Sequence, residues 1–281
     1  MEPIARLVKE GMTAVLSHGN GPIVGNILIR NEAVRDQIAP MPLDVCGADS
    51  EGGIGYMMQQ SLQNELRRLG IERTVVTLVT QVVVDERDPA FRRPTKPIGP
   101  FYAQDRARTL AREKGWTVVE DSGRGWRRVV ASPKPLEIVE IDAIRTLVDQ
   151  GTIVIAAGGG GVPVTRQWDG SLHGVEAVID KDLASSLLGR LLGVETLVIV
   201  TGVERVATSY NKPEQREITK ACASELERWL GEGHFPPGSM GPKIQAAIEF
   251  VRGGGREVVI TSPEKVAEAM QGKAGTTIVP D

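Results

Sequence analysis

The feature that most constrains the fold of this chain is a repeated alternation between short apolar segments and longer amphipathic ones. From about residue 140 to the C-terminal end, helix-like and strand-like patterns follow one another. In order, these are the helix "EIDAIRTLVDQG", the strand "TIVIAAGGGG", a hairpin in "VTRQWDGSLHGVEAV", the helix "DKDLASSLLGRLLG", the strand "ETLVIVTG", helices around 219–231 and 240–252, the strand "REVVITS", the helix "PEKVAEAM" and the strand "TTIV". Repeated β–α units predict an α/β fold with a mainly parallel sheet covered by helices on both faces.

The first half of the chain follows the same alternation with one interruption. The segments "TAVLS" and "RTVVTLVTQVVV" are expected strands, and "GGIGYMMQQSLQNELRRLG" is an expected helix that ends at Gly70. After them comes "DERDPAFRRPTKPIGPFYAQ", which is dense in proline and charge. We therefore expect residues 85–137 to form an insertion that projects from the main sheet. The alternation opens with a helix, so the first β–α unit lacks its strand.

Composition narrows the functional classes. The 281 residues carry a formal net charge of -3, and only 4% are aromatic, which favours neither nucleic-acid binding nor an anionic membrane surface. No uncharged apolar run approaches the roughly 20 residues of a membrane span, and the N-terminal segment lacks the apolar core of a signal peptide. The 2 cysteines and 3 histidines form no metal-like spacing, so we expect a cytoplasmic protein without a metal-ligating residue set.

Two glycine-rich segments follow expected strands. "SHGNGPIVGN" almost matches the G-x-G-x-x-G of a dinucleotide site, but its third glycine, Gly25, is one place late, and Pro22 follows the second. It remains open as another anion cradle or as a tight strand-to-helix turn. The second segment, Gly158 to Gly161, is either a tight strand exit or a loop that presents free N–H groups to an anion. In a parallel sheet, both segments lie at the carboxyl ends of strands, where ligands bind.

Two lysines favour a polyphosphate site near these loops. "VIDKDLASSLL" places Lys181 in a first helical turn after Asp180 as N-cap, and "GSMGPKIQAAIEF" places Lys243 in another first turn after Ser239. The helix dipole disfavours cations there by about 0.3–1 kcal/mol, so a pair of such lysines indicates function. Lys96 stands between prolines, and "DSGRGWRRVV" carries several arginines. Both segments are either parts of an anion-gripping lid or solvated loops.

At these residues the sequence resembles the carbamate kinases of the amino acid kinase family, from about Ala5 to the C-terminal end. The resemblance rests on "HGNGP", "GYMMQQSLQNELRR", "DPAFRRPTKPIGPFY", "EDSGRGWRRVV", "AAGGGGVPV", "GVEAVIDKDLA" and "GHFPPGSMGPK". It implies a three-layer αβα sandwich, with residues 1–281 as one domain and 85–137 as an inserted lid. It further implies a homodimer and reversible phosphoryl transfer between ATP with Mg²⁺ and carbamate, which in reverse makes ATP from ADP and carbamoyl phosphate. It implies no nucleic-acid partner.

The resemblance also assigns roles to residues of this chain. Lys181 and Lys243 would stabilise charge on the transferring phosphoryl group, with Asp180 orienting them, and Lys96 would reach the substrate from the lid. These four are the expected catalytic residues. The expected substrate-binding residues are His18, Gly19, Asn20 and Gly21. The residues expected to bind nucleotide or phosphate are Gly158, Gly159, Gly160, Gly161, Thr201, Val203, Val206, Ser239, Met240 and Gly241.

One departure from the family leaves alternatives open. The family begins with an apolar strand that runs into a Gly-Gly-Asn-Ala loop, and nothing in this sequence matches it. Two neighbouring strands would then carry unpaired backbone groups, so we expect this form to fold poorly or close the gap, with at most a small fraction of full activity. The alternatives are another amino acid kinase, acting on acetylglutamate, aspartate or a nucleotide; a non-catalytic remnant that binds nucleotide or serves as a dimer partner; and a dinucleotide-binding module.

Overall fold

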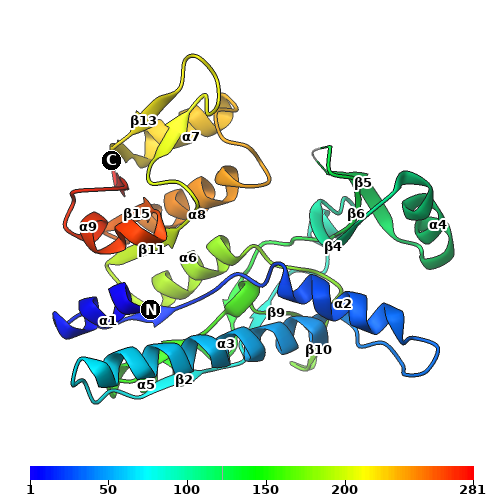
Figure 1. Ribbon diagram of the computed structural model, residues 1–281, viewed down its shortest axis with the longest axis horizontal. Helices are drawn as coiled ribbons and strands as arrows, with labels where there is room; N and C mark the ends of the chain where they lie inside the picture. Colours follow the sequence, from blue (N-terminus) through cyan, green and yellow to red (C-terminus); the bar gives the residue numbers. More distant parts are fainter. Residues whose placement is uncertain (122) are drawn as a thin grey trace.

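The computed structural model describes residues 1–121 and 123–281, which form a body and a projecting segment (Figure 1). The helices are α1 (Glu2–Lys9), α2 (Ile23–Ala33), α3 (Leu43–Arg68), α4 (Gln104–Lys114), α5 (Ile141–Asp149), α6 (Lys181–Leu192), α7 (Ala223–Gly231), α8 (Met240–Arg252) and α9 (Val266–Met270). The strands are β1 (Val15–Leu16), β2 (Val75–Thr77), β3 (Gln81–Val83), β4 (Lys96–Tyr102), β5 (Thr117–Glu120), β6 (Trp126–Val130), β7 (Glu137–Ile138), β8 (Ile153–Ile155), β9 (Val162–Arg166), β10 (Leu172–Gly174), β11 (Thr196–Val200), β12 (Val206–Thr208), β13 (Arg216–Ile218), β14 (Lys220–Cys222), β15 (Glu257–Thr261) and β16 (Thr276–Val279).

The strands of the body form ladders in which parallel pairs predominate. β8 lies between β1 and β2, and both pairs are parallel. In a second ladder, β11-β15-β16-β14, only β15 and β16 are antiparallel. A third ladder, β10-β9-β3-β7, follows the first along the chain, because β9 comes after β8 and β3 after β2. The predicted α/β class with a mainly parallel sheet is confirmed.

The sheet of the body is interrupted between its first two ladders. β1 ends one ladder and β11 ends the other, and no pairing joins them within the part of the chain that the structure describes. Their side chains are mostly half-buried, unlike those of β8, which are fully buried. Each of these two strands therefore has one edge without a neighbouring strand among the described residues.

Alternate side chains of β8 face two different helical layers. Ile153 and Ile155 pack with Leu66 of α3, whereas Val154 packs with Leu187 of α6. This is the period of two that a strand imposes on its side chains. Figure 1 shows α3 and α6 on different sides of these strands. The three-layer αβα arrangement follows, and a further core under α7 and α8 packs against β11, β15 and β16.

The long helix α3 begins earlier than the sequence pattern predicted. The predicted helix began at Gly52, but α3 begins at Leu43 with Pro42 at its N-cap position. Leu43 and Cys46 are buried in the first two turns. Proline is tolerated beside a helix start, and burial of these side chains outweighs the low helix propensity of the glycines that follow.

The apolar run 73–84, predicted as one strand, is divided between β2 and β3 in different ladders. At the break, the Thr80 N–H donates to Glu51 Oε2 (3.1 Å), and the Thr80 hydroxyl donates to the Leu78 carbonyl (2.8 Å). Side-chain bonds therefore replace strand pairing here. The pattern gave no sign of the break because the interrupting carboxyl belongs to α3, about 30 residues away in the chain.

A second difference concerns residues 220–222. They were predicted as part of a helix but form the strand β14.

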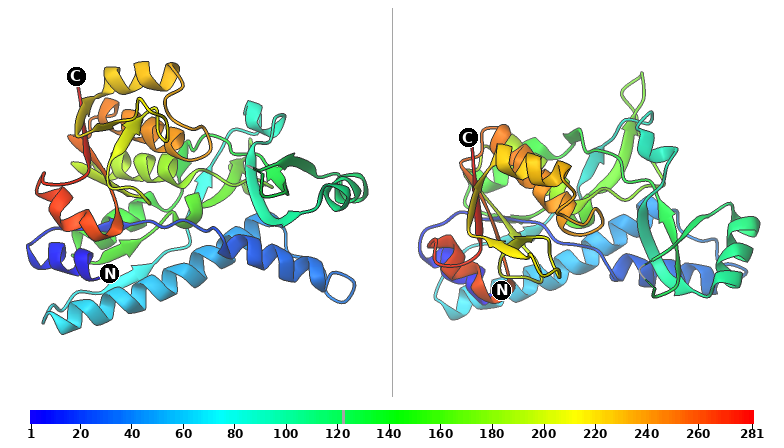
Figure 2. Two further views of the ribbon diagram at one scale, coloured as in Figure 1. Left: turned by 45° about the horizontal axis from the view of Figure 1, so that its top comes forward. Right: turned by 90° about the horizontal axis from the view of Figure 1, so that it is seen from above.

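Part of the segment 85–137, hereafter the lid segment, stands apart from the body in two views (Figures 1 and 2). Its strands pair in the order β4-β6-β5, all antiparallel, and α4 packs beside β5 and β6. α2 of the body lies against β4, and Lys114 forms an ion pair with Glu32 across this junction. The chain returns to the body at β7, which pairs with β3.

Candidate active site

Two loops and the start of α6 are packed together at the carboxyl end of β8. The glycine turn, Gly158 to Gly161, makes this packing possible. A methyl group on Gly159 would lie 2.6 Å from Asn20 Nδ2, and one on Gly158 would overlap the His18 ring. One on Gly160 would overlap the carbonyl group of Ile179, directly before Asp180. Any side chain larger than hydrogen would therefore push the "HGNG" loop and α6 away from β8.

The glycine turn does not present the free N–H groups that its sequence suggested. Gly158 donates to Glu51 Oε1 (2.9 Å), and Gly159 donates to the His18 carbonyl (2.7 Å). Gly160 and Gly161 donate within the turn, to Ala157 and Gly158. The interpretation of this segment as a set of bare donors is therefore wrong for this structure. The glycines serve the close approach of the two loops instead.

The two lysines of the expected phosphate site meet on one carboxylate, that of Asp182. Its Oδ1 lies 2.6 Å from Lys181 Nζ, and its Oδ2 lies 2.9 Å from Lys243 Nζ. The Asp182 side chain is only 7% exposed and that of Lys243 14%. As predicted, both lysines lie in first helical turns, of α6 and α8. Two ammonium groups held by one carboxylate leave a net positive charge beside the glycine turn.

Asp180 has a different partner from the one expected. As predicted, it is the N-cap of α6, where its side chain accepts the N–H groups of Asp182 (2.9 Å) and Leu183 (3.4 Å). Its Oδ2 accepts from Lys96 Nζ of the lid segment at 2.8 Å. Burial opposes ionisation of Asp180, but the Lys96 ammonium and the two N–H groups outweigh it and hold its pKa below the usual value.

The expectation that Asp180 orients Lys181 and Lys243 is thus corrected: Asp182 makes both contacts. The sequence contained one sign of this, because "DKD" places a second acid next to Lys181. A carboxylate in a first helical turn has a simple explanation in the helix dipole, which favours it there. Its contact with Lys243, on another helix, required the tertiary structure.

The "HGNG" loop lies over Lys181. A methyl group on Gly19 would be 3.3 Å from Lys181 Cδ, so the loop backbone and the lysine stem are in close contact. The His18 ring is largely buried, with Nδ1 3.0 Å from the Gly19 carbonyl. Burial lowers the pKa of His18, with the backbone oxygens of Gly19 and Glu51 acting in the opposite direction. His18 is therefore neutral at pH 7 and adds no charge to the site.

The positions expected to contact a nucleotide differ in how accessible they are. Val206 is fully buried in the core, and its N–H donates to Thr276 Oγ1 at 2.9 Å, so its side chain and N–H are not available to a ligand. Thr201 and Val203 follow β11 and are partly exposed. Ser239 is the N-cap residue of α8, directly followed by Met240 and Gly241. Gly241 is buried, and its N–H donates to the Pro236 carbonyl (2.9 Å). The other residues are at least partly accessible and lie at the ends of elements that carry Lys243 or pack beside it.

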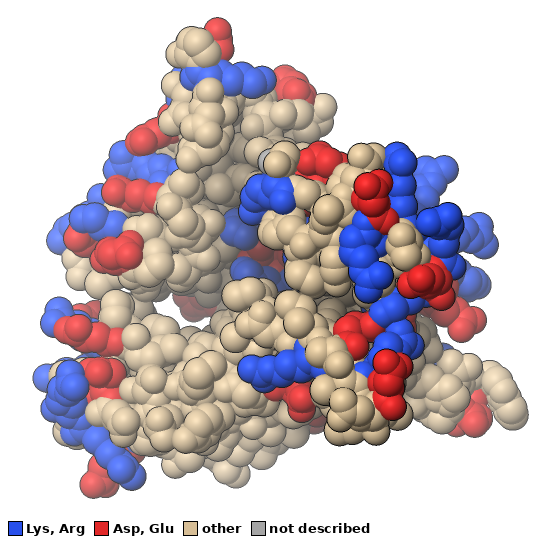
Figure 3. Space-filling view, turned by 45° about the vertical axis from the view of Figure 1, so that its right-hand side comes forward, with Lys and Arg blue, Asp and Glu red and all other residues tan. Residues whose placement is uncertain are grey.

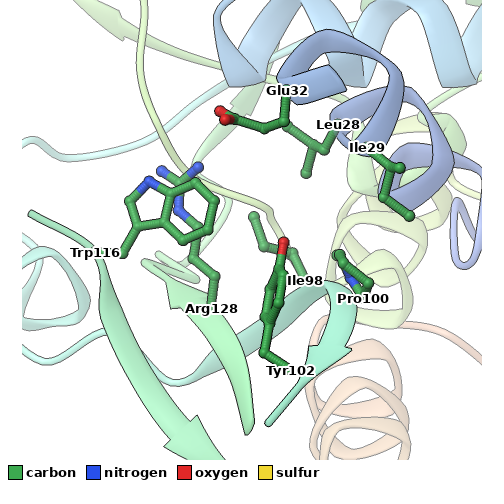
Figure 4. Close-up of a pocket in the computed structure, with 9 residues that line it drawn as sticks. Leu28, Ile29, Glu32, Ile98, Pro100, Tyr102, Trp116 and Arg128 are labelled. Carbon is green, nitrogen blue, oxygen red and sulfur yellow. The ribbon is translucent and has the colours of Figure 1, made fainter. Parts of the chain in front are cut away.

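Of the arginines of "DSGRGWRRVV", Arg124 and Arg127 contact the lid segment itself, whereas Arg128 also reaches the body. The guanidinium carbons of Arg124 and Arg127 lie 4.9 and 5.1 Å from the Phe101 ring centroid, which is cation–π geometry. Arg128 lies over Trp116 and pairs with Glu176. Figure 4 shows Arg128 and Trp116 in a small pocket between α2 and the lid segment, which Glu32 and Tyr102 also line. None of the lysines or aspartates described above lines this pocket.

In the face shown in Figure 3, basic and acidic side chains lie inside a central recess. Within residues 1–121 and 123–281, no three side chains of the metal-ligating types gather closely enough to hold a metal ion. The same residues contain no helix with the length and apolar character that a membrane crossing requires. The site is therefore defined by ammonium and carboxylate groups and by two tightly packed loops.

Similarity to known proteins agrees with this architecture. The amino acid kinase family model matches residues 1–262, and the chain belongs to that family. A carbamate kinase from Pyrococcus horikoshii is 51% identical over 279 residues, covering 99% of this chain and 88% of the relative. The solved carbamate kinase from Giardia lamblia bound to AMP-PNP is 45% identical with a TM-score of 0.91, covering 99% and 88%. A solved protein from Aeropyrum pernix K1 is 43% identical with a TM-score of 0.94, covering 100% and 90%.

Proposed function

We propose that this protein catalyses reversible phosphoryl transfer between ATP and carbamate, including the direction that makes ATP from ADP and carbamoyl phosphate. The observation that carries the proposal is the pair of ammonium groups, Lys181 and Lys243, held on Asp182 beside the glycine turn. Relatives at about half identity over nearly the whole chain are named carbamate kinases. A site built from lysines suits a transfer whose catalysis depends on positioning and charge neutralisation.

The transfer needs no nucleophile from the protein. In the ATP-forming direction, a terminal phosphate oxygen of ADP forms a bond to the phosphorus of carbamoyl phosphate. The bond from phosphorus to the carbamate oxygen breaks, and carbamate leaves with the electron pair. Lys181 and Lys243 lower the free energy of the negative charge that spreads over the transferring group, and Asp182 holds them in place. In the opposite direction carbamate supplies the attacking oxygen.

The carbamate end of the site is proposed to lie at His18, Gly19, Asn20 and Gly21. This loop is held against the glycine turn and over Lys181. Lys96 is proposed to leave Asp180 and contact the bound anion, since it is the lysine of the lid segment nearest to α6. The segment 85–137 would then act as a lid on a single domain spanning residues 1–281. The negative charge of the bound anion would then replace the Asp180 carboxylate as the partner of the Lys96 ammonium group.

The nucleotide end is proposed to lie at Thr201, Val203, Ser239, Met240 and Gly241, near the first turn that carries Lys243. Mg²⁺, when bound with the nucleotide, neutralises phosphate charge. The described residues fit an ion that is bound mainly by the nucleotide phosphates, because the two carboxylates of the site, Asp180 and Asp182, are already paired with lysines. The phosphates of the nucleotide would therefore supply most of the ligands for the ion. We also propose a homodimer in the cytoplasm, where the thiols of Cys46 and Cys222 stay reduced.

The test is an ATP-formation assay with purified protein, ADP, Mg²⁺ and carbamoyl phosphate. Acetyl phosphate replaces carbamoyl phosphate as one control. In the reverse direction, acetylglutamate, aspartate and nucleoside monophosphates are offered with ATP. We expect turnover with carbamoyl phosphate to exceed that with every other substrate. Nucleotide binding without turnover on any substrate would instead identify a non-catalytic member of the family. Sedimentation of the protein at several concentrations tests the homodimer.

A further inference from the structure

Glu51 is the most deeply buried carboxyl group near the site, with 1% of the residue exposed. It lies in the first third of α3, and each of its oxygens accepts one backbone N–H. Oε1 accepts from Gly158 (2.9 Å), and Oε2 accepts from Thr80 (3.1 Å). A carboxyl in this position connects α3 to two chain segments that are far from it and from each other in sequence. One of those segments is the glycine turn.

The bond to Gly158 is the first in a chain of contacts that ends at the substrate loop. Directly before the turn, the Ala157 N–H donates to Thr80 Oγ1 (2.9 Å), and Ala157 has a left-handed φ of 51°. Within the turn, directly after Gly158, the Gly159 N–H donates to the His18 carbonyl (2.7 Å). Two successive N–H groups are thus held by Thr80 and Glu51, and the next one, of Gly159, holds the "HGNG" loop. The direction of the turn depends on Glu51 and Thr80.

The same helix offers an internal comparison. Gln59 Oε1 accepts the N–H of Thr77 (2.8 Å), and Gln63 Oε1 accepts the N–H of Val75 (3.1 Å). Both glutamines therefore bind β2 with side-chain oxygens, as Glu51 binds Thr80. Neither glutamine bond reaches the glycine turn. A purely structural role for Glu51 would make it equivalent to these two residues.

We propose that Glu51 is a positioning residue, which through Gly158 fixes the glycine turn and thereby sets the "HGNG" loop against Lys181. The proposal rests on the proposed function in one respect only, namely that the loop it positions binds the substrate. Among the described residues, Glu51 forms no hydrogen bond or ion pair with the lysines of the site or with Asp180 and Asp182; its bonds go to Thr80 and Gly158. It therefore acts on turnover through the backbone of the two loops and not through direct contact with the reacting groups.

The test compares Glu51→Ala and Glu51→Gln with the matched control Gln59→Ala. The glutamine variant keeps the shape and one acceptor oxygen of Glu51, whereas the alanine variant loses both. A loop displaced by about 1 Å lowers turnover about 10²-fold. We expect that loss of kcat in Glu51→Ala, a smaller loss in Glu51→Gln, and less than a threefold change in Gln59→Ala. The dissociation constant of ADP, measured by calorimetry, should change less than threefold in all three.

Amide hydrogen exchange in the free protein supplies a readout that needs no activity. We expect the amides of residues 157–161 to exchange at least 10-fold faster in Glu51→Ala than in the unchanged protein, and to be unaffected in Gln59→Ala. Unchanged exchange in that segment overturns the positioning role. So does a loss of kcat that is equal in Glu51→Ala and Gln59→Ala, because that result describes general destabilisation.

The experiment also distinguishes two other outcomes: misfolding of Glu51→Ala and inactivity of the unchanged protein. Should Glu51→Ala fail to fold, Glu51→Gln carries the test: normal exchange in 157–161 together with normal kcat overturns the proposal. Should the unchanged protein make no ATP from carbamoyl phosphate, the proposed function fails. The exchange comparison then still decides whether Glu51 fixes the turn.

Discussion

Two aspartates at the start of α6 hold lysines in different ways, although only Lys181 separates them in the chain. Asp182 is buried and holds Lys181 and Lys243, which all belong to the body. Asp180, which is buried as well, holds Lys96 of the lid segment. The first arrangement joins two helices of one packed core. The second arrangement joins the lid segment to the body.

Both aspartates are buried, so the difference between the pairs lies in the lysines: Lys243 is 14% exposed, whereas Lys181 and Lys96 are each 34% exposed. Breaking a buried pair leaves desolvated charges, so the contact between Asp182 and Lys243 is expected to be permanent. An ion pair that reaches solvent contributes little net free energy and exchanges readily for another partner. We infer that Asp182 builds the site whereas Asp180 and Lys96 respond to its occupancy. The predictions below test this comparison, from the largest expected effect to the smallest.

The largest effect is expected for the lysines held by Asp182. Lys181→Ala or Lys243→Ala removes an ammonium group that neutralises the transferring phosphoryl group, so kcat should fall about 10²-fold or more. The melting temperature should fall less than in Asp182→Ala, because each single variant leaves Asp182 with its other lysine. The control is Lys265→Ala, whose ammonium pairs with Glu268. Unchanged kcat in both site variants would show that these lysines take no part in the reaction.

The next effect concerns the stability of the two aspartates. Asp182→Ala leaves two ammonium groups without their buried partner, and removing one member of a buried pair costs about 3–5 kcal/mol. Asp180→Ala removes a helix cap and a partly exposed ion pair, and loss of a cap costs about 0.5–2 kcal/mol. Urea unfolding of both variants measures the difference. Equal destabilisation would contradict the contrast between a permanent and an exchangeable pair.

A smaller, more selective effect is expected at Lys96. Lys96→Ala should lower the use of carbamoyl phosphate by about 10-fold, since loss of one charge contact of 1.4 kcal/mol gives a factor of about ten. ADP affinity should stay within about threefold. The kcat and KM for carbamoyl phosphate, together with calorimetry of ADP binding, separate these effects. A loss of ADP affinity equal to the loss for carbamoyl phosphate would assign Lys96 to the nucleotide end.

The last expected effect is a slope of stability against pH, with opposite signs at two carboxyls. Burial raises the pKa of Glu51 to about 8, while N–H bonds from Thr80 and Gly158 partly offset it and the Glu140 charge adds to it. A carboxyl in the unfolded chain titrates near 4.5. Between these values the unfolded state releases a proton that the folded state keeps, so stability falls by about 1.4 kcal/mol per pH unit.

Glu51→Gln removes this titration, so its free energy of unfolding should vary less between pH 5 and 8 than that of the unchanged protein. Asp180→Asn should differ in sign, because the folded pKa of Asp180 is depressed. The stability from that ionised group is present above its ordinary pKa of 3.8 and is lost as pH falls below it. Urea unfolding at several pH values measures both slopes. Parallel curves for Glu51→Gln and the unchanged protein would show that Glu51 titrates normally.

Local patterns determined a large part of this protein. Alternating strand and helix periodicity predicted the parallel ladders, because one buried face per element leaves a period of two or 3.6 in the sequence. The N-cap at Asp180 and the first-turn positions of Lys181 and Lys243 were also predictable. Capping depends on residues at most three positions apart, so the information is contiguous in the chain. The long strings shared with carbamate kinases located the same segments.

The tertiary structure decided which groups meet. Asp182 and Lys243 lie about 60 residues apart, and Glu51 and Gly158 lie more than 100 apart. The hydrophobic periodicity of single helices and strands therefore could not predict either contact. The Glu51 carboxyl accepts the Thr80 N–H at the break in 73–84 and the Gly158 N–H at the start of the glycine turn. These features come from partners brought together by core packing. A buried donor or acceptor takes the nearest available partner, and the sequence alone does not show which partner that is.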